Sequence, residues 1–395
     1  MITADDAQAL AEQHGTPFYL YELSVLRERA RRLRAAMPAT LLYAVKANPN
    51  EAVLRALHGL VDGLDVASLG ELELALRCGW APQQLSFAGP GKTQHELEAA
   101  IRHGVLLSVE SIRELDALSP SLPELSRSRG GEGRGEGKPQ PRPRLRLRLN
   151  PSLRAQAYRV PMIGGPSPFG IDEEELALAT DHLLRHASTI DFDGIHVHPG
   201  GQCTSVGAFS AAAAATLDLA EQVHRRIPVR TINFGGGFGV LGSEELDVEA
   251  AGKRLGAMLE KYRASTGQAL EAVVEPGRWL VAPAGLYVAR VVSEKRSRGK
   301  HFVVLDGGMN HHLGATGHLG KLDLPLVNLS RPGAPRVMRT VVGPLCTPLD
   351  TLGADVELAE PQLGDLIGVR GSGAYGYSFS PLHFLGHPLP AEVVR

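Results

Sequence analysis

Short apolar runs alternate with longer segments of helical periodicity along most of the chain. The run at 41–45 has the pattern of a buried strand, and in 51–58 the apolar positions recur every three or four residues. About eight such strand–helix units follow one another, an order typical of a (β/α)8 barrel. The expected strands, each with the helix that follows it, are 41–45 and 51–58, 64–67 and 70–77, 85–88 and 94–103, 106–109 and 111–118, 145–149 and 173–186, 194–197 and 207–225, and 231–234 and 246–262.

After position 275 the pattern changes to short strands separated by turn residues. The runs at 286–292, 301–305, 336–342 and 366–369 have this form, which indicates an antiparallel β domain. The chain is therefore predicted to be an α/β protein of two domains. We expect a barrel over 28–270 and a β domain built from 1–27 and 271–395.

One segment, 126–144, breaks the alternation. Glycine, proline and charged residues dominate it, so it has little to bury and is predicted to be a flexible surface insertion within the barrel. A nucleic-acid-binding tail is the alternative, because the segment is basic. It is less favoured, since the segment is short and has no aromatic residue to stack on bases.

Composition narrows the class of protein. The 395 residues carry 41 basic and 43 acidic side chains, a net charge of −2, which argues against a nucleic-acid-binding face. The three cysteines form no CxxC pair, so neither a structural metal site nor a disulfide framework is expected. There is no signal-like start and no apolar run of membrane-spanning length. We expect a cytoplasmic enzyme that binds neither membrane nor nucleic acid.

Lys46 is the first candidate for chemistry. It lies in an apolar, strand-forming run that Asn48, Pro49 and Asn50 end abruptly. Burying a lysine is costly unless it is paired or used, and burial lowers the pKa of a lysine, which frees its amine to form a Schiff base. An isolated lysine of this kind would more simply be a surface residue at a strand end. Because other parts of the chain supply partners, we interpret Lys46 as a reactive amine.

A glycine run follows the predicted strand at 231–234. Gly235, Gly236 and Gly237 would let backbone N–H groups approach a phosphate without obstruction by side chains. Glycine runs are usually only turns. A position after a strand in the second half of a barrel, however, suits the phosphate site of that architecture.

Two histidines and a glutamate lie at other strand ends. His196 and His198 are two residues apart and so share one face of a strand. With no acidic trio beside them, a metal site is the weaker interpretation. Glu275 follows two valines, which makes a plain solvated position improbable, although a structural ion pair is the simple alternative. Cys346 could equally be an inert buried thiol.

Several longer runs resemble the fold-type III decarboxylases that depend on pyridoxal phosphate (PLP), the alanine-racemase-like group that includes diaminopimelate and ornithine decarboxylases. The resemblance extends from Gly15 to the C-terminus and is greatest to the carrier-protein-linked glutamyl decarboxylases of butirosin-type biosynthesis and to siderophore-pathway decarboxylases. The runs that carry it are Tyr43-Ala44-Val45-Lys46-Ala47-Asn48-Pro49-Asn50, Phe87-Ala88-Gly89-Pro90-Gly91-Lys92, Gly343-Pro344-Leu345-Cys346-Thr347-Pro348, Ser372-Gly373-Ala374-Tyr375-Gly376 and 379–388.

The resemblance implies a role for each candidate. Lys46 would hold PLP, His198 would stack on its ring, and Glu275 would pair with the ring nitrogen and favour decarboxylation over racemisation. Cys346 would reach the active site of a neighbouring subunit in a homodimer and return a proton. The remaining expected contacts are the cofactor-binding residues Asp65, Ser68, Arg148, Gly235, Gly236, Gly237, Gly277, Arg278 and Tyr375, and the substrate-binding residues Arg278, Thr347 and Asp350. For Asp65 and Arg148, an ion pair inside the barrel is an equally good interpretation.

One departure from the family pattern concerns the substrate. The diaminopimelate and ornithine enzymes carry an acid directly after the cysteine, where this chain has Thr347. A neutral hydroxyl cannot balance a partly buried ammonium. We therefore expect an amino acid or conjugate without a free distal ammonium, either carrier-tethered or citryl-linked. The alternatives are a basic amino-acid decarboxylase, a racemase on the same fold, and a non-catalytic PLP-binding protein.

Overall fold

The computed structural model describes residues 2–124, 142–242, 244–317 and 324–395. Most of the predicted insertion at 126–144 lies outside these ranges. The chain divides into two compact units, each described by itself below. The barrel unit comprises Ala30–Gly239 and Leu246–Gly277, and the β unit comprises Met1–Arg29, Val240–Glu245 and Arg278–Arg395.

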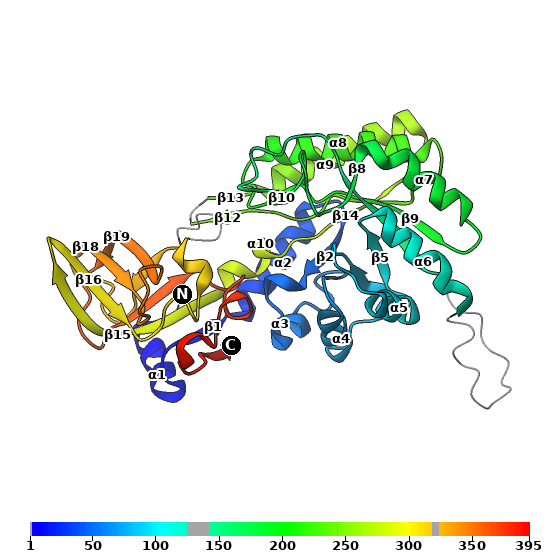
Figure 1. Cartoon of the computed structure of the whole chain (residues 1–395). Helices are drawn as coiled ribbons and strands as arrows, with labels where there is room; N and C mark the ends of the chain where they lie inside the picture. Colours follow the sequence, from blue (N-terminus) through cyan, green and yellow to red (C-terminus); the bar gives the residue numbers. More distant parts are fainter. Residues whose placement is uncertain (1, 125–141, 243, 318–323) are drawn as a thin grey trace, which may run out of the picture. The chain divides into compact units, whose positions relative to one another are not determined.

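Within the described residues, eight parallel strands form a closed ring in the barrel unit (Figure 1). The ring closes because β5 pairs with both β4 and β6, so the sheet has no free edge there. This confirms the (β/α)8 barrel. The ring strands are β2 (Thr40–Ala44), β3 (Gly63–Val66), β4 (Leu85–Phe87), β5 (Leu106–Val109), β6 (Arg144–Asn150), β9 (Asp191–His196), β11 (Thr231–Asn233) and β14 (Glu271–Val274).

Helices connect these strands and begin at capping residues visible in the sequence. Thr93 and Glu96 form a capping box at the start of α5, and Gly104 ends that helix in the left-handed conformation. Ser205 and Asp247 cap the two long helices α8 and α9. The helices are α2 (Leu23–Ala36), α3 (Glu51–Ala56), α4 (Leu69–Arg77), α5 (Gln94–His103), α6 (Ile112–Glu124), α7 (Leu176–Arg185), α8 (Val206–His224) and α9 (Val248–Thr266).

The interior of the barrel is charged rather than purely apolar. Along β6 the leucines at 145, 147 and 149 share one face, and Arg146 and Arg148 occupy the other. Arg146 donates to Asp193 and to Thr231, each over 2.9 Å. Neighbouring strands are therefore joined by buried ion pairs as well as by backbone hydrogen bonds.

The β unit contains a sheet whose pairings are mostly antiparallel. The strand order is β17-β20-β15-β16-β18-β19, with β1 joining β15 to β21. This confirms the antiparallel β domain, in which two pairs, β16–β18 and β1–β21, are parallel. The strands are β1 (Phe18–Tyr21), β15 (Gly285–Ser297), β16 (Lys300–Leu305), β17 (Leu326–Asn328), β18 (Arg336–Val342), β19 (Thr351–Ala359), β20 (Leu366–Arg370) and β21 (Ala391–Val394).

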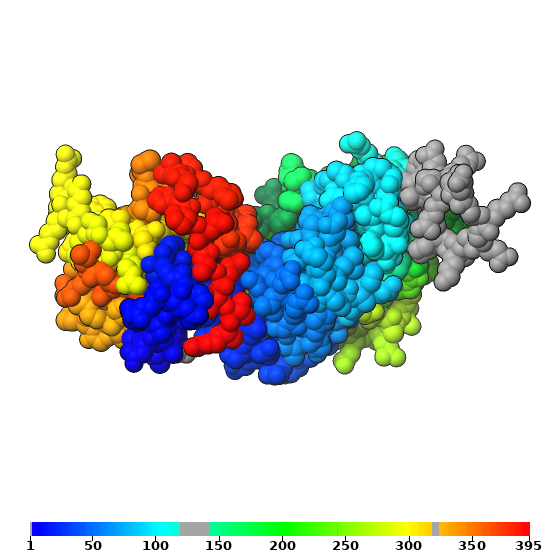
Figure 2. Space-filling view, turned by 90° about the horizontal axis from the view of Figure 1, so that it is seen from below, coloured from blue at the N-terminus to red at the C-terminus, as the bar shows by residue number. Residues whose placement is uncertain are grey.

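The two ends of the described chain meet in this unit. Helix α1 (Ala4–His14) and the C-terminal residues lie side by side, as the blue and red atoms of Figure 2 show. Arg395 forms ion pairs with Glu22 and Asp6 across the junction. In the part of the chain that is described, no helix combines the length and the apolar character that crossing a membrane requires.

Candidate active site

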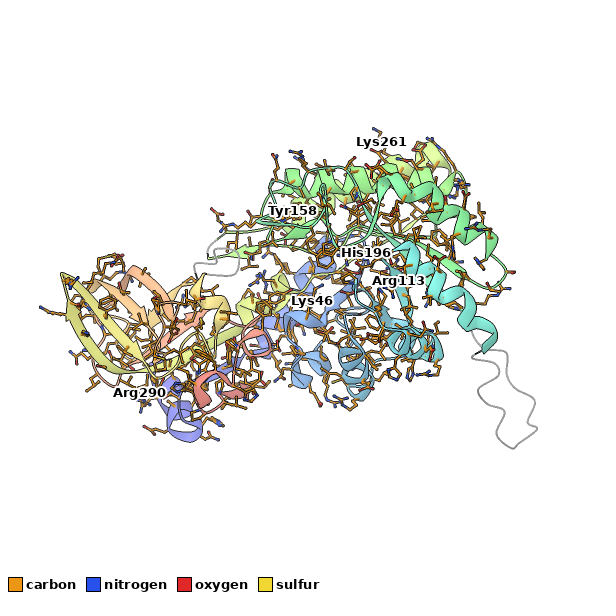
Figure 3. All side chains as sticks on the ribbon, viewed as in Figure 1. Lys46, Arg113, Tyr158, His196, Lys261 and Arg290 are labelled. Carbon is orange, nitrogen blue, oxygen red and sulfur yellow. The ribbon has the colours of Figure 1, made fainter. Side chains whose placement is uncertain are left out.

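Lys46 lies just beyond the carboxyl end of strand β2, close to where the predicted strand 41–45 ends. Strand β2 ends at Ala44, and Lys46 is on a short 3-10 turn, η1 (Val45–Ala47). Its Nζ is 3.8 Å from Asp65 Oδ2, and its side chain is 43% exposed, whereas that of Asp65 is 2% exposed. The expectation of a buried lysine is therefore wrong. The amine is open to a reactant. Lys46 and His196 lie by the strands of the barrel, whereas Lys261 is on an outer helix (Figure 3).

Glu275 is a buried carboxylate directly after β14. The side chain of Asn233 donates a hydrogen bond to its Oε1, and His196 Nε2 is 3.4 Å from its Oε2. Burial alone would raise the pKa of Glu275, but the interactions with His196, His198 and Lys46 outweigh burial and hold that pKa below its usual value. Glu275 is therefore ionised at neutral pH.

His198 faces the same carboxylate from the loop after β9. Its Nδ1 accepts a hydrogen bond from the Gly236 N–H over 3.2 Å, so the proton of the neutral ring is on Nε2. Burial, helped by the charges of Lys46 and Arg148, holds the pKa of His198 well below its usual value, and Glu275 opposes this only in part. A neutral imidazole is the form suited to face an aromatic ring.

The glycine run packs too closely for any side chain. A Cβ at Gly236 would lie 2.1 Å from the Glu275 carbonyl oxygen, and one at Gly237 would lie 1.8 Å from the Gly200 oxygen. The Gly235 N–H donates to Asn233 Oδ1 over 2.8 Å. The glycines thus bring the loop against the Glu275 backbone. With the amides of Gly235 and Gly236 used inside the protein, a phosphate-binding role for them stays a prediction.

Asp65, Ser68 and Arg148 have partners of their own. Burial raises the pKa of Asp65 well above its usual value, and the charge of Glu275 adds to this, so its contact with Lys46 is a weak ion pair. Ser68 caps helix α4. Arg148 Nη1 is 2.8 Å from Glu110 Oε1. This is an ion pair inside the barrel, which was one of the two interpretations of Arg148.

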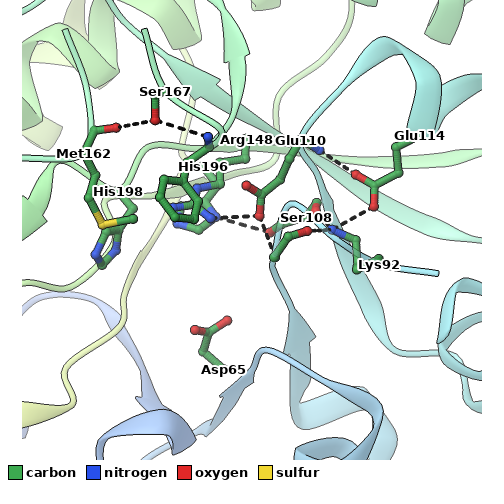
Figure 4. Close-up of polar contacts among 12 residues, drawn as sticks. Asp65, Lys92, Ser108, Glu110, Glu114, Arg148, Met162, Ser167, His196 and His198 are labelled. Carbon is green, nitrogen blue, oxygen red and sulfur yellow. Dashed lines mark hydrogen bonds and ion pairs between the residues drawn. The ribbon is translucent and has the colours of Figure 1, made fainter. Parts of the chain in front are cut away.

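The sequence analysis missed a set of buried charges behind Arg148 (Figure 4). Lys92, only 1% exposed, pairs with Glu114 over 2.8 Å and donates to the backbone oxygens of Gly89 and Ser108. Glu110 accepts from the Gly89 N–H as well as from Arg148. The run Gly91-Lys92 was recognised as a family motif, but the pattern does not reveal the partner of Lys92. Asn233 was also missed, although it is a polar residue at a strand end.

Five predicted residues, Arg278, Cys346, Thr347, Asp350 and Tyr375, belong to the β unit. Arg278 lies over the Tyr375 ring, with Cζ 4.6 Å from the ring centroid, and Tyr375 has a positive φ of 53°. Cys346 is exposed and Thr347 is half-buried. Asp350 is buried and accepts from the Met309 and Leu345 N–H groups, so it holds the 343–350 loop together. Its contact with a substrate stays a prediction.

The fold and this set of residues define an enzyme class. The closed barrel presents an accessible amine, a buried ionised carboxylate, a neutral histidine and a loop whose glycine positions leave no room for a side chain. Together these features fit PLP. The chain matches the family model "Pyridoxal-dependent decarboxylase, pyridoxal binding domain" over residues 23–282. It belongs to this family and is a PLP-dependent decarboxylase.

Two curated relatives show the range of substrates in the family. The chain is 35% identical to the L-glutamyl-[BtrI acyl-carrier protein] decarboxylase of Niallia circulans, with 98% of this chain and 90% of that protein aligned. It is 31% identical to the diaminopimelate decarboxylase of Aquifex aeolicus, over 98% of this chain and 88% of the relative. The two relatives differ in substrate, so similarity by itself does not choose the substrate of this enzyme.

A solved structure has the same fold along almost the whole chain. The diaminopimelate decarboxylase of Helicobacter pylori, complexed with L-lysine, aligns with a TM-score of 0.85 at 27% identity and covers 98% of this chain and 93% of its own. The agreement extends over both units, so the β unit belongs to the shared architecture.

Proposed function

We propose that this decarboxylase acts on an amino acid or amino-acid conjugate that has no free distal ammonium, carried on a protein or linked to citrate, in specialised-metabolite or siderophore biosynthesis. Thr347 carries this proposal, because it follows Cys346 where the basic amino-acid enzymes resembled by this chain have an acid. The relative that acts on an acyl-carrier-protein-linked glutamyl group supports it.

Thr347 offers no negative charge to a substrate ammonium. A substrate ammonium that enters a partly buried site loses water and needs a counter-charge, and leaving it unpaired costs several kcal/mol. Thr347 is half-buried, and its hydroxyl accepts a hydrogen bond from the Leu349 N–H over 3.3 Å. The hydroxyl carries no charge, so an uncharged amide, ester or thioester is the better match.

The residues of the barrel unit have separate roles in this proposal. Lys46 attaches the cofactor covalently, Glu275 keeps a protonated ring nitrogen paired, and neutral His198 lies against the ring. When bound, PLP takes up the electron pair left on Cα as the bond to the carboxylate breaks and CO₂ departs. The Cys346 thiol would supply the proton that replaces CO₂ on Cα, or Lys46 would supply it once the substrate amine has replaced Lys46 on the cofactor and the freed amine is protonated.

The β unit would supply further contacts. Arg278 and Tyr375 form a cation–aromatic pair suited to an anionic group of the cofactor or the substrate. We also propose that the enzyme works as a homodimer with Cys346 serving a neighbouring subunit. Large apolar side chains exposed near the C-terminus support a contact surface there, namely those of Phe379, Phe384, Leu385 and Leu389.

A substrate comparison tests the proposal. Wild-type enzyme should release CO₂ from an amide- or thioester-linked glutamyl compound at least ~10²-fold more efficiently than from lysine, ornithine or meso-diaminopimelate. Thr347→Glu should shift this preference toward the three diamino acids. Thr189→Glu, which adds the same charge at an exposed barrel position, is the matched control and should leave the preference unchanged.

Two results would contradict the proposal. If the wild type decarboxylates diaminopimelate as efficiently as the best conjugate, the enzyme is a basic amino-acid decarboxylase. Its similarity to diaminopimelate decarboxylases supports this alternative. An unchanged preference in Thr347→Glu would show that this position does not contact the distal end of the substrate.

A further inference from the structure

Three potential metal ligands converge at the end of the barrel strands. One atom each of His196, His198 and Glu275 lies within 4.8 Å of the other two. The sequence pattern places all three residues at strand ends, and the structure shows that their ligand atoms converge. We propose that, before the cofactor binds, these three residues hold a divalent transition-metal ion, with Zn²⁺ as the best match. We expect the metal and the cofactor to exclude one another, and this expectation rests on the proposed cofactor roles of His198 and Glu275.

The distances suit a small tetrahedral ion. Donors bound at about 2.0–2.1 Å to one Zn²⁺ lie roughly 3.4 Å apart. His196 Nε2 is 3.4 Å from Glu275 Oε2, and His198 Nδ1 is 4.0 Å from the same oxygen. His198 Nδ1 accepts a hydrogen bond from the Gly236 N–H over 3.2 Å. Metal binding would require the His198 ring to turn away from this N–H and would replace the hydrogen bond.

Neighbouring residues already orient the ligands as in a metal site. Ser108 Oγ is 3.3 Å from His196 Nδ1, which leaves Nε2 to face Glu275. Asn233 occupies Glu275 Oε1 and leaves Oε2. His196 is only 1% exposed, and its Nε2 faces Glu275 Oε2 over 3.4 Å. Second-shell contacts of this kind fix ligand orientation and raise metal affinity.

The donor set selects the ion. Two imidazoles and one carboxylate favour Zn²⁺, Co²⁺ or Cu²⁺ over Mg²⁺ and Ca²⁺, which prefer oxygen ligands. With three protein ligands, a fourth position is left for water. Because the same carboxylate and imidazole are the proposed partners of the cofactor ring, bound metal should slow the uptake of PLP, and a chelator should restore it.

Cobalt binding to the full-length apoenzyme tests this inference. Co²⁺ alone should bind with one-to-one stoichiometry and give the visible absorption of a tetrahedral centre. Glu275→Gln and His196→Asn should abolish that spectrum, and Ser108→Ala should weaken binding roughly tenfold. His301→Asn is the control, since His301 Nε2 lies 3.0 Å from Glu294 Oε2 in a histidine–glutamate pair outside the cluster. It should bind Co²⁺ like the wild type.

A second measurement uses only wild-type protein and so does not depend on the folding of variants. Enzyme loaded with PLP should not give the cobalt spectrum, and cobalt-loaded apoenzyme should take up PLP more slowly until a chelator is added. No tetrahedral spectrum from the apoenzyme, or an equal spectrum with Glu275→Gln, would overturn the metal site. A cobalt spectrum that PLP does not affect would overturn the competition and the shared roles of Glu275 and His198, while leaving the metal site standing.

Discussion

At the scale of single residues, accessibility separates Lys46 from the charges around it. Its side chain is 43% exposed and lies beside the buried Asp65, whereas Lys92 is 1% exposed and is enclosed by Glu114 and two backbone oxygens. A lysine held by three acceptors cannot attack a carbonyl without breaking buried bonds. Of these two lysines, Lys46 is therefore the better placed for covalent chemistry.

The first prediction concerns this amine. Lys46→Ala should lose the cofactor adduct that borohydride reduction makes permanent, because no other amine is expected to attach PLP. Mass spectrometry of the reduced protein measures the adduct. Lys261→Ala, on the outer helix α9, is the control and should keep it. A reducible adduct that persists in Lys46→Ala would show that another lysine holds the cofactor.

At the scale of elements, the turn after β11 is shaped by contacts that only glycine permits. Gly237 has a φ of 81°, and its position against the Gly200 oxygen leaves no room for a Cβ. The turn lies against the Glu275 backbone and the His198 ring at the same time. Any shift of the turn therefore moves both residues.

Gly237→Ala should accordingly weaken PLP binding by ~10-fold or more, because the added Cβ would clash with the Gly200 oxygen and displace the turn, and it should also lower stability by about 1–3 kcal/mol. A titration of apoenzyme with PLP measures this. Gly267→Ala is the matched control, because Gly267 also has a positive φ, of 74°, but a Cβ there would meet nothing within 4 Å. Equal PLP affinities for the two variants would show that the close approach at Gly237 does not matter for the cofactor.

At the scale of the whole molecule, the barrel is closed partly by buried charge. Arg146 pairs with Asp193 over 2.9 Å, and Thr231 donates to the same carboxylate over 2.6 Å, which links β6, β9 and β11. Burial opposes ionisation of Asp193, but Arg146 and Thr231 outweigh it and hold its pKa below the usual 3.8. The ionised Asp193 therefore stabilises the folded state fully at pH values above the unfolded-state pKa. This stabilisation is lost as the pH falls through the lower, folded-state pKa.

Asp193→Asn should destabilise the protein at neutral pH by about 3–5 kcal/mol, because Arg146 is left buried without its counter-charge. The difference from the wild type should narrow once the pH falls below about 4, as the wild-type carboxylate becomes protonated. Melting temperatures across this pH range measure both effects. Asp181→Asn, which removes an exposed partner of Arg226, should change little. A difference independent of pH would argue against an ionised Asp193.

The order of the elements and the positions of the principal reactive groups can be predicted from the amino-acid sequence. Apolar periodicity predicted the strand–helix units, and parallel strands bring their ends to one edge, so Lys46, His198 and Glu275 could be expected together. The remaining features depend on how the chain folds in three dimensions. The exposure of Lys46, the proton position on His198 and the pairing of Arg148 with Glu110 depend on which side chains meet inside a closed ring. Such meetings join strands distant in the sequence, and no local pattern records them.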